Sequence, residues 1–294
     1  MLRIALLTSA LLFATGAALA ADAPAKSARA EAADAALARA IAGDWRDPKN
    51  SARDAHRHPA ETLSFFGLRA NQQIVEITPG GGGWYAEILA PYLRDKGRYN
   101  AAMVDPATLP EGRRDYQQKS LDDLKARLAA HPSRFDKTAF VLFDPKQPRF
   151  GDAGGADAVL TFRNVHNWVS AGTADGYFSA FFEALKPGGV LGVVEHRAKP
   201  GTDLDTMKKS GYLTEALVIE LATKAGFVLD ARSEVNANPK DTADHPNGVW
   251  TLPPVNRHDA EDAQKYRAIG ESDRMTLRFV KPAAKAADQY PVER

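Results

Sequence analysis

The apolar positions of this chain alternate between two periods from Asn71 onward. Short apolar runs predict buried strands at residues 74–77, 101–104, 140–143, 158–161 and 190–194. Helical spacing separates most of these runs, as Leu121, Leu124 and Leu128 illustrate. Two further strands are expected near residues 227–234 and 275–280. Buried strands that alternate with helices predict a doubly wound α/β fold, with a mostly parallel sheet of seven strands.

A glycine-rich loop follows the first predicted strand. It runs from Glu76 through Thr78, Gly80 and Gly82 to an amphipathic helix. Glycines allow a ligand to approach the backbone, and the N-terminus of the next helix offers free N–H groups to a carboxylate or phosphate. Ligands of open α/β sheets bind beyond the carboxyl ends of the strands. The loop therefore predicts a site for a dinucleotide or for S-adenosylmethionine.

Two acidic residues end the next two predicted strands. Asp105 lies 29 residues after Glu76, where a carboxylate can accept hydrogen bonds from both ribose hydroxyls. Asp144 closes the third strand, where a carboxylate can accept a hydrogen bond from an adenine amino group. Two acids at successive strand ends favour an adenosyl ligand.

In these features the chain resembles the class I S-adenosylmethionine-dependent methyltransferases, over about residues 60–282. Glu76, Gly80 and Gly82 fit the first glycine loop of that family, and Thr78 stands where the family has its first loop glycine. Residues 156–161, 185–189 and 225–227 resemble the segments around the fourth, fifth and sixth strands of the family. The chain is most similar to exported bacterial proteins described as predicted methyltransferases, with which it shares stretches like residues 57–62 and 245–254.

The resemblance implies an enzyme that uses S-adenosylmethionine to methylate a small-molecule acceptor. It also implies a set of cofactor-binding residues at the strand ends and the glycine loop. These are Glu76, Thr78, Gly80, Gly82, Asp105, Asp144 and Arg163.

Two pairs of candidate catalytic residues follow the fourth and fifth strands. Asn164 and His166 come after the fourth strand, and Glu195 and His196 come after the fifth. Parallel strands place both pairs at one crevice. His166 is the candidate base, because imidazole titrates near neutral pH. The alternatives are that His166 shapes its loop beside Trp168 and that the second pair holds the loop that follows it.

The segment from Asn236 to Ser272 is a 37-residue insert between the last two predicted strands. A connection this long in a compact domain is typical of a lid or a binding loop. Trp250 in this insert favours a packed lid, and residues 57–66 are expected to close the site from the other side. The candidate substrate contacts are Trp84, Tyr85, Trp168 and Trp250.

Composition limits the remaining chemistry. Of the 294 residues, 44% are apolar, 26% are charged and none is cysteine, so disulfides, thiolate metal sites and cysteine nucleophiles are absent. The formal net charge of +1 falls to 0 without Arg3, the one charged residue of the first twenty, and a neutral protein lacks the basic surface of a nucleic-acid binder. A metal site of several histidines with Glu195 is a weaker alternative, because no pair has the HExxH spacing, and no metal is expected.

Two further function classes stay open at this point. A non-catalytic exported protein with the same fold would bind an adenosyl compound without turnover. A nicotinamide oxidoreductase is disfavoured, because the Lys-Pro-Gly-Gly turn at residues 186–189 and a final strand after a long insert resemble methyltransferase features.

The chain begins with a pattern typical of a secretory signal peptide. Arg3 is followed by an apolar stretch and by Ala18-Leu19-Ala20, a small-residue cleavage site. A membrane anchor is the alternative, but the stretch is rich in alanine and contains Thr8 and Ser9. The expected organisation is a signal peptide at 1–20, a tether with a short helix at 21–45, a methyltransferase-like domain at 46–282 and a tail at 283–294.

We therefore expect a periplasmic or secreted protein without stable membrane insertion, whose mature chain begins near Ala21. N-terminal sequencing of the protein from an envelope fraction checks this expectation. An intact Met1 in a membrane pellet would contradict the signal peptide.

Overall fold

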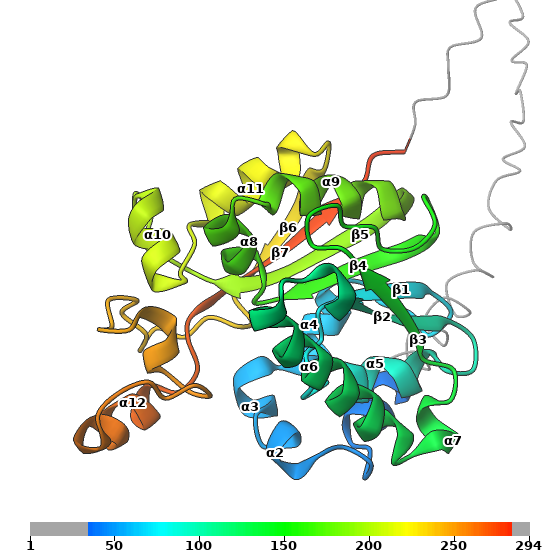
Figure 1. Ribbon diagram of the computed structural model, residues 1–294, viewed down its shortest axis with the longest axis horizontal. Helices are drawn as coiled ribbons and strands as arrows, with labels where there is room; N and C mark the ends of the chain where they lie inside the picture. The colour runs from blue at the N-terminus through cyan, green and yellow to red at the C-terminus, as the bar shows by residue number, and fades with distance from the viewer. Residues whose placement is uncertain (1–34, 284–294) are drawn as a thin grey trace, which may run out of the picture.

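The computed structural model describes residues 35–283 (Figure 1). The predicted signal peptide, most of the tether and nearly all of the C-terminal tail lie outside these residues. The described part begins with a helical segment at residues 35–41. Within the described residues, no helix combines the length and the apolar character needed to cross a membrane.

One sheet of seven strands forms the centre of the fold, as predicted. The strands are β1 (Gln73–Ile77), β2 (Arg98–Val104), β3 (Ala139–Phe143), β4 (Ala156–Phe162), β5 (Leu185–His196), β6 (Val228–Ser233) and β7 (Arg274–Val280). Their order across the sheet is β3-β2-β1-β4-β5-β7-β6. The pairs from β3 to β5 are parallel, and β7 runs antiparallel to both β5 and β6. The predicted doubly wound, mostly parallel sheet is confirmed.

Helices cover both faces of this sheet (Figure 1). The first group is α2 (Pro48–Ser51), α3 (Asp54–Arg57), α4 (Pro59–Phe65), α5 (Ala86–Leu93), α6 (Glu111–Ala129) and α7 (Pro132–Phe135). The second group is α8 (Val165–Ala171), α9 (Ala174–Ala184), α10 (Leu204–Ser210) and α11 (Glu215–Lys224), with α12 (Ala263–Ile269) in the insert. Three short 3-10 helices are η1 (Pro106–Thr108), η2 (Gly248–Thr251) and η3 (Ala260–Asp262).

Alternating side chains of the strands divide the interior into two cores. On one face, Val75 of β1 and Val159 of β4 pack in a cluster with Phe178 and Phe181 of α9. On the other face, residues of β1, β2 and β4 pack with α4, α5 and α6, where Leu121, Leu124 and Leu128 form the buried stripe. Strands that are buried on both faces read as continuous apolar runs, which is why the sequence pattern located them.

The winding direction of the sheet reverses between β1 and β4, which lie side by side in the middle. The connection after β1 therefore leads to one side and the connection after β4 to the other. A crevice forms at such a point beyond the carboxyl ends of the strands. Thr78 and Gly80 of the glycine loop and the candidate residues after β4 lie there.

The Lys186-Pro187-Gly188-Gly189 segment lies inside β5 rather than before it. Ala156 pairs with Leu185 and Ala158 pairs with Val190, so four residues of β5 bulge out opposite a single residue of β4. Gly188 has a φ of +78°, which a glycine adopts without steric cost. The predicted turn is therefore a wide bulge between two paired parts of one strand.

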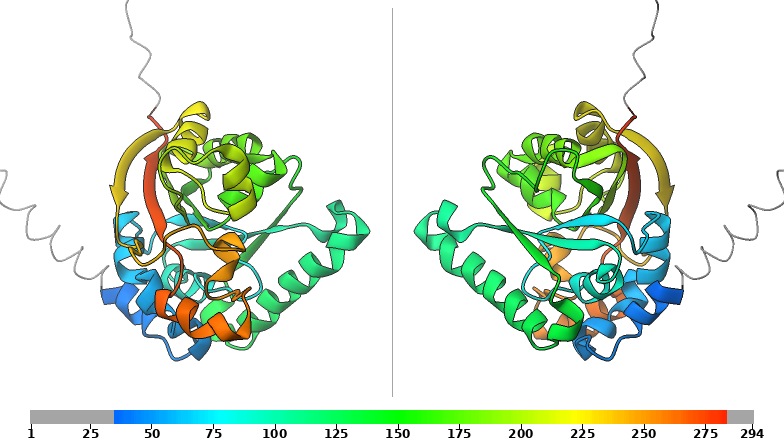
Figure 2. Two further views of the ribbon diagram at one scale, coloured as in Figure 1. Left: turned by 90° about the vertical axis from the view of Figure 1, so that its left-hand side faces the viewer. Right: turned by 90° about the vertical axis from the view of Figure 1, so that its right-hand side faces the viewer.

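The long insert is packed against the rest of the protein at both of its ends. Asn236 is buried, and its amide donates to the hydroxyls of Thr62 in α4 and Thr276 in β7, at 3.0 and 2.9 Å. At the other end, Glu271 is buried among arginines of α3 and β7. The insert and the start of α6 lie on opposite sides of the crevice, and the start of α6 projects from the body of the protein (Figure 2).

Candidate functional site

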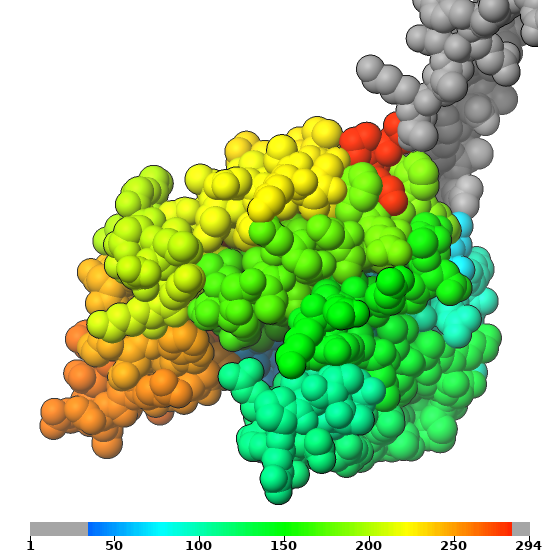
Figure 3. Space-filling view, turned by 45° about the horizontal axis from the view of Figure 1, so that its top comes forward, coloured from blue at the N-terminus to red at the C-terminus, as the bar shows by residue number. Residues whose placement is uncertain are grey.

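A cavity of about 550 Å³ lies at the carboxyl ends of β1 and β4. Its size is in the usual range for small-molecule sites. Figure 3 shows a hollow on this side, between the orange insert and the blue-green start of α6. The wall residues come from the glycine loop, the segment after β4, one face of α6 and the insert. They include Arg57, Glu76, Thr78, Gly80, Trp84, Tyr85, Tyr116, Arg163, Asn164, His166, Trp168, Tyr177, His196 and Trp250.

The glycine loop combines two different roles. Thr78 and Gly80 line the cavity, and both have positive φ angles, +50° and +70°. A β-branched residue in this region is strained, whereas a glycine is not. A Cβ on Gly81 would lie 2.9 Å from Cβ of Asp123, and one on Gly83 would lie 2.7 Å from Cδ1 of Leu124. These two glycines therefore allow α6 to pack on the loop.

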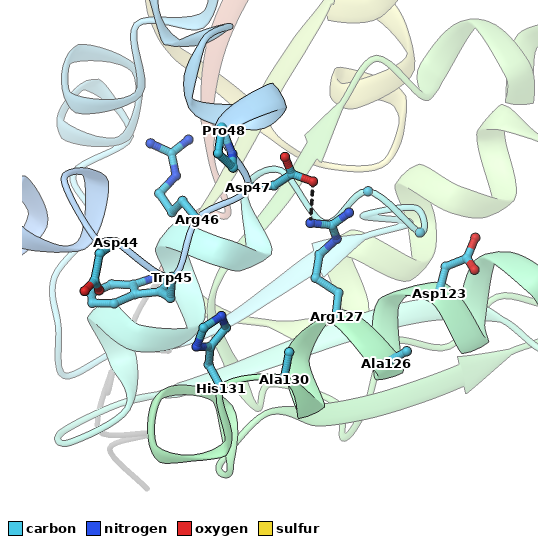
Figure 4. A pocket seen from close by; sticks show the side chains of 12 residues that line it. Asp44, Trp45, Arg46, Asp47, Pro48, Asp123, Ala126, Arg127, Ala130 and His131 are labelled. Atoms are coloured by element: carbon cyan, nitrogen blue, oxygen red, sulfur yellow. Dashed lines mark hydrogen bonds and ion pairs between the residues drawn. The ribbon is translucent and has the colours of Figure 1, made fainter.

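Gly82 lines a different depression, of about 680 Å³. Figure 4 shows Asp47 and Arg127 at this depression. The carbonyl of Gly82 accepts a hydrogen bond from the amide of Asn50 at 2.9 Å, and the indole of Trp84 donates to the carbonyl of Asn50 at 2.7 Å. Arg127 pairs there with Asp47 at 3.0 Å and with the buried Glu87 at 2.9 Å. The groups around this depression thus hold the N-terminal segment and the glycine loop together.

Asp105 and Asp144 lie at the predicted strand ends but outside the lining of the cavity. The N–H of Asp105 donates to the carbonyl of Phe143, so the ends of β2 and β3 are adjacent. One carboxylate oxygen of Asp105 caps η1 through the N–H of Ala107 at 2.9 Å, and Asp144 accepts from the N–H of Lys146 at 2.8 Å. The roles of both acids in ribose and adenine binding remain predictions.

His166 is held by the carboxylate of Glu195, which lies within β5 and not after it as predicted. Nδ1 of His166 lies 3.0 Å from one oxygen of Glu195, and the N–H of His166 donates to the other oxygen at 3.2 Å. A proton on Nδ1 that points to a carboxylate leaves Nε2 as the basic nitrogen. Because His166 lines the cavity and Glu195 is fully buried behind it, Nε2 is the nitrogen available to a ligand.

His196 and Asn164 complete the predicted pairs with different partners. Nδ1 of His196 lies 2.6 Å from the hydroxyl of Ser272, and burial lowers the pKa of His196 well below its usual value, with nearby His166 and Arg163 adding to the decrease. His196 is therefore neutral at pH 7. The amide of Asn164 donates to the carbonyl of Ile77 at 2.9 Å, so it joins the ends of β4 and β1. Asn164 acts on the shape of the cavity wall.

Three potential metal ligands meet at this wall, His166, Glu195 and His196, with ligand atoms within 4.8 Å of one another. The oxygens of Glu195 already accept from three N–H groups, two of His166 and one of His196. The guanidinium groups that lower the pKa of His196 create a positive potential at the same place. Both facts oppose a cation here and favour a neutral or anionic ligand.

Aromatic side chains form the two flanks of the cavity. Tyr85 stacks on Phe162 with ring centroids 3.5 Å apart, and Trp168 stacks on Tyr177 at 4.2 Å. Trp250 of the insert lies edge-on to His166, 6.1 Å between ring centroids. The predicted substrate contacts Trp84, Tyr85, Trp168 and Trp250 therefore all line one cavity.

A buried ion cluster behind the cavity was absent from the sequence-based prediction. Glu271 accepts from Arg53 at 2.7 Å, from Arg57 at 3.3 Å and from Arg274 at 3.1 Å. Burial raises the pKa of Glu271, but the surrounding guanidinium groups outweigh it and lower this pKa to about 2. The spacing of these residues along the chain gives no signal of the cluster, which forms only when the insert packs on α3.

Among known proteins, this chain is similar in fold to several solved structures. No protein-family model matches the chain, and no curated protein matches it in sequence. A solved structure described as a sarcosine dimethylglycine methyltransferase from Galdieria sulphuraria is 14% identical with a TM-score of 0.52, covering 80% of this chain and 88% of that one. The cyclase SpnF is 16% identical with a TM-score of 0.53, covering 86% and 95%. A SAM-dependent methyltransferase from Aquifex aeolicus is 14% identical with a TM-score of 0.48, covering 80% and 94%.

The chain has the class I methyltransferase fold. At these identities the likeness is one of architecture, and the resemblance drawn from the sequence motifs is confirmed at that level. SpnF is named as a cyclase, so the fold by itself leaves the reaction open.

Glu76 is an acid of the cavity wall whose pKa is raised. It is buried, and the hydroxyl of Tyr99 donates to it at 2.6 Å. Burial raises the pKa of Glu76 from 4.5 to about 8, although the bond from Tyr99 and the charge of Arg57 oppose this increase. Glu76 is therefore mostly protonated at pH 7 and adds little negative charge to the cavity.

This raised pKa predicts a loss of stability at high pH. Below pH 4.5 the carboxyl is protonated in both the folded and the unfolded state, so it does not reduce the free energy of unfolding. As the pH rises from 4.5 to about 8, the carboxyl ionises more readily in the unfolded state, and the free energy of unfolding falls. We expect the wild type to lose at least about 1.4 kcal/mol relative to Glu76→Gln between pH 5 and pH 9, the equivalent of one pKa unit. Urea unfolding of both proteins across this range measures the difference, and parallel profiles would contradict a protonated Glu76.

Proposed function

We propose that this protein transfers a methyl group from S-adenosylmethionine to a small-molecule acceptor. The observation that carries the proposal is one cavity that joins the glycine loop after β1 to a carboxylate-bound histidine after β4. The first element is suited to holding a ligand against backbone N–H groups, and the second is suited to removing a proton. The fold supports the proposal, because it is shared with S-adenosylmethionine-dependent methyltransferases.

The residues at the cavity fit an adenosyl compound. Gly80 has open space where a Cβ would stand, so a ligand can approach the backbone of the loop. Trp168 and Tyr177 offer flat apolar surfaces on the side where Asp144 influences the pKa of Tyr177. Asp105 lies between the loop and Asp144 at the ends of neighbouring strands. These positions would hold the methionine, ribose and adenine parts in that order.

The cofactor supplies a methyl group activated on a positively charged sulfur. The protein then has to bind the acceptor, orient it, and remove a proton where the acceptor carries one. Nε2 of His166 is available for that proton, and Glu195 stabilises the positive charge that the ring acquires, at 3.0 Å from Nδ1. Neutral His196 lies beside it, with ring centroids 5.2 Å apart, and adds no competing charge.

The insert and the aromatic flanks reduce the access of water to this point. Trp168 is buried, and Trp250 covers the edge of His166 from the side of the insert. A drier site strengthens each charge interaction inside it, because the local dielectric constant is lower. The insert therefore contributes to the chemistry as well as to the selection of the acceptor.

Binding of the cofactor is tested with Asp105→Ala. S-adenosylhomocysteine is expected to raise the melting temperature of the wild type, because a ligand of the folded state stabilises it. The variant loses two charge-assisted hydrogen bonds to the ribose, so its affinity should fall at least about tenfold, the equivalent of 1.4 kcal/mol. Scanning calorimetry measures the melting temperature, and titration calorimetry measures the affinity.

The matched control for this variant is Asp203→Ala. Asp203 caps α10 by accepting from the N–H of Thr206 at 2.9 Å, as Asp105 caps η1, but it follows β5 and not one of the strands β1 to β3 whose ends are assigned to the cofactor. The control should bind S-adenosylhomocysteine as the wild type does. Absence of binding to the wild type at millimolar ligand would refute the proposed cofactor.

The role of His166 is tested with His166→Asn. If Nε2 removes a proton from the acceptor, the substitution lowers kcat by roughly 10²–10⁴-fold and leaves the affinity for S-adenosylhomocysteine nearly unchanged. His245→Asn is the matched control, because His245 also pairs with a carboxylate, Asp241 at 2.8 Å, outside the cavity lining. Turnover is followed as S-adenosylhomocysteine release with an acceptor found by screening. Unchanged turnover in a stably folded His166→Asn protein would exclude the base.

A further inference from the structure

One wall of the cavity is formed by guanidinium groups with unused hydrogen-bond donors. Arg163 follows β4 directly with a φ of +61°, lines the cavity and has no side-chain hydrogen bond to any other residue between 35 and 283. Arg57 also lines the cavity, and its Nη2 is buried without a hydrogen-bond partner. Buried donors of charged groups are costly to leave unpaired. Both side chains therefore offer donors to a ligand.

The charges around this wall do not balance. Arg53, Arg57, Arg163 and Arg274 influence one another and share two nearby carboxylates, Glu271 and Glu195. Arginine stays protonated in proteins, so four positive charges face two negative charges, an excess of two. Burial lowers the pKa of Arg163 to about 10, with Glu271 opposing the decrease and Arg274 and Arg53 adding to it.

Glu76 and His196, two other titratable groups at this wall, do not neutralise the excess positive charge. Glu76 is mostly protonated at pH 7, and His196 is neutral. S-adenosylmethionine does not remove the excess either, because its ammonium and sulfonium charges outnumber its one carboxylate. Its binding would raise the positive charge of the cavity, although its carboxylate could occupy one arginine. The missing negative charge has to come from the second ligand of the cavity.

We propose that the acceptor is an anion, and that Arg163 and the free Nη2 of Arg57 bind its carboxylate or phosphate group. This inference rests on the proposed methyl transfer for the identity of the second ligand. Arg163 lies close enough to His196 to lower the pKa of that histidine, and the ring of His166 is next to the ring of His196. An anion bound by Arg163 would therefore lie in the same cavity as His166. A guanidinium fork suits carboxylate and phosphate groups because its parallel N–H donors match their oxygens.

The experiment uses protein saturated with S-adenosylhomocysteine and three anionic probes, namely acetate, benzoate and inorganic phosphate. Acetamide and benzamide are the neutral counterparts of the two carboxylates. Calorimetry should detect at least one anion, bound at least about tenfold more tightly than its amide. Arg163→Gln should weaken that anion at least about tenfold, and Arg163→Lys, which keeps the charge but loses the fork, should weaken it less.

The control variant is Arg149→Gln, whose side chain is 80% exposed and makes only a 3.7 Å contact with Glu183. It should bind the anion as the wild type does. Melting temperatures confirm that each variant is folded. If no probe binds, or if anions and amides bind equally well, the anion site is refuted.

A second titration separates the acceptor from the cofactor as the source of the anion. Arg163→Gln is compared with the wild type for S-adenosylhomocysteine and for 5′-methylthioadenosine, which lacks the carboxylate. A loss of affinity for the first compound alone would mean that Arg163 binds the carboxylate of the cofactor, and the proposal would be wrong. If the wild type binds neither compound, the methyl-transfer proposal fails instead. In that case the ligand-free protein is titrated with the three anions. Binding that Arg163→Gln weakens would support the anion site, and absence of binding would refute it.

Discussion

The ion cluster around the carboxylate of Glu271 is the interaction on which the position of the insert depends. This carboxylate lies at the end of the insert and accepts hydrogen bonds from arginines of α3 and β7, which are more than two hundred residues apart in the chain. Removing one partner of a buried ion cluster leaves the others uncompensated, at a cost of several kcal/mol. Glu271 therefore fixes the insert over the cavity and also holds together the guanidinium groups that face it. The position of the insert beside the cavity and the positive charge of the cavity wall both depend on this ion cluster.

The sequence predicted the sheet because each of its central strands is buried on both faces. Apolar runs such as residues 158–161 have no polar alternation that would place them at a surface, and all seven predicted strands are present. The segment from Lys186 to Gly189 was interpreted as a turn, since Pro and Gly usually end a strand. Its pairing with β4 on either side of a bulge depends on Ala156 and Ala158, which are distant in sequence. Local composition cannot contain that information.

The sequence predicted those residues of the candidate site whose position depends only on the strand order of the sheet. Residues that follow β1, β4 and β5 reach one crevice in any doubly wound sheet, so Thr78, Gly80, His166 and His196 were found. The partners of these side chains were not predictable. Glu195 of β5 binds the imidazole of His166, which follows β4, whereas the imidazole of its neighbour His196 binds Ser272. Tyr116 of α6 was missed although it precedes the apolar stripe of Leu121 and Leu124. An exposed tyrosine beside such a stripe is usually solvated, and only the projecting start of α6 brings it to the cavity.

Several non-glycine residues with positive φ line this cavity or adjoin a residue that lines it. Thr78 follows β1, Arg163 follows β4 and His58 follows Arg57, with φ of +50°, +61° and +43°. Such conformations cost of order 1–3 kcal/mol each and persist when the surroundings hold them. The N–H groups of Thr78 and Arg163 donate to the carbonyls of Ala102 and Val194 on neighbouring strands, so the sheet itself holds both residues. The common fold leaves the reaction open, as the cyclase SpnF illustrates. The strain and the unpaired charge belong to this chain, and both act on the cavity where the acceptor would bind.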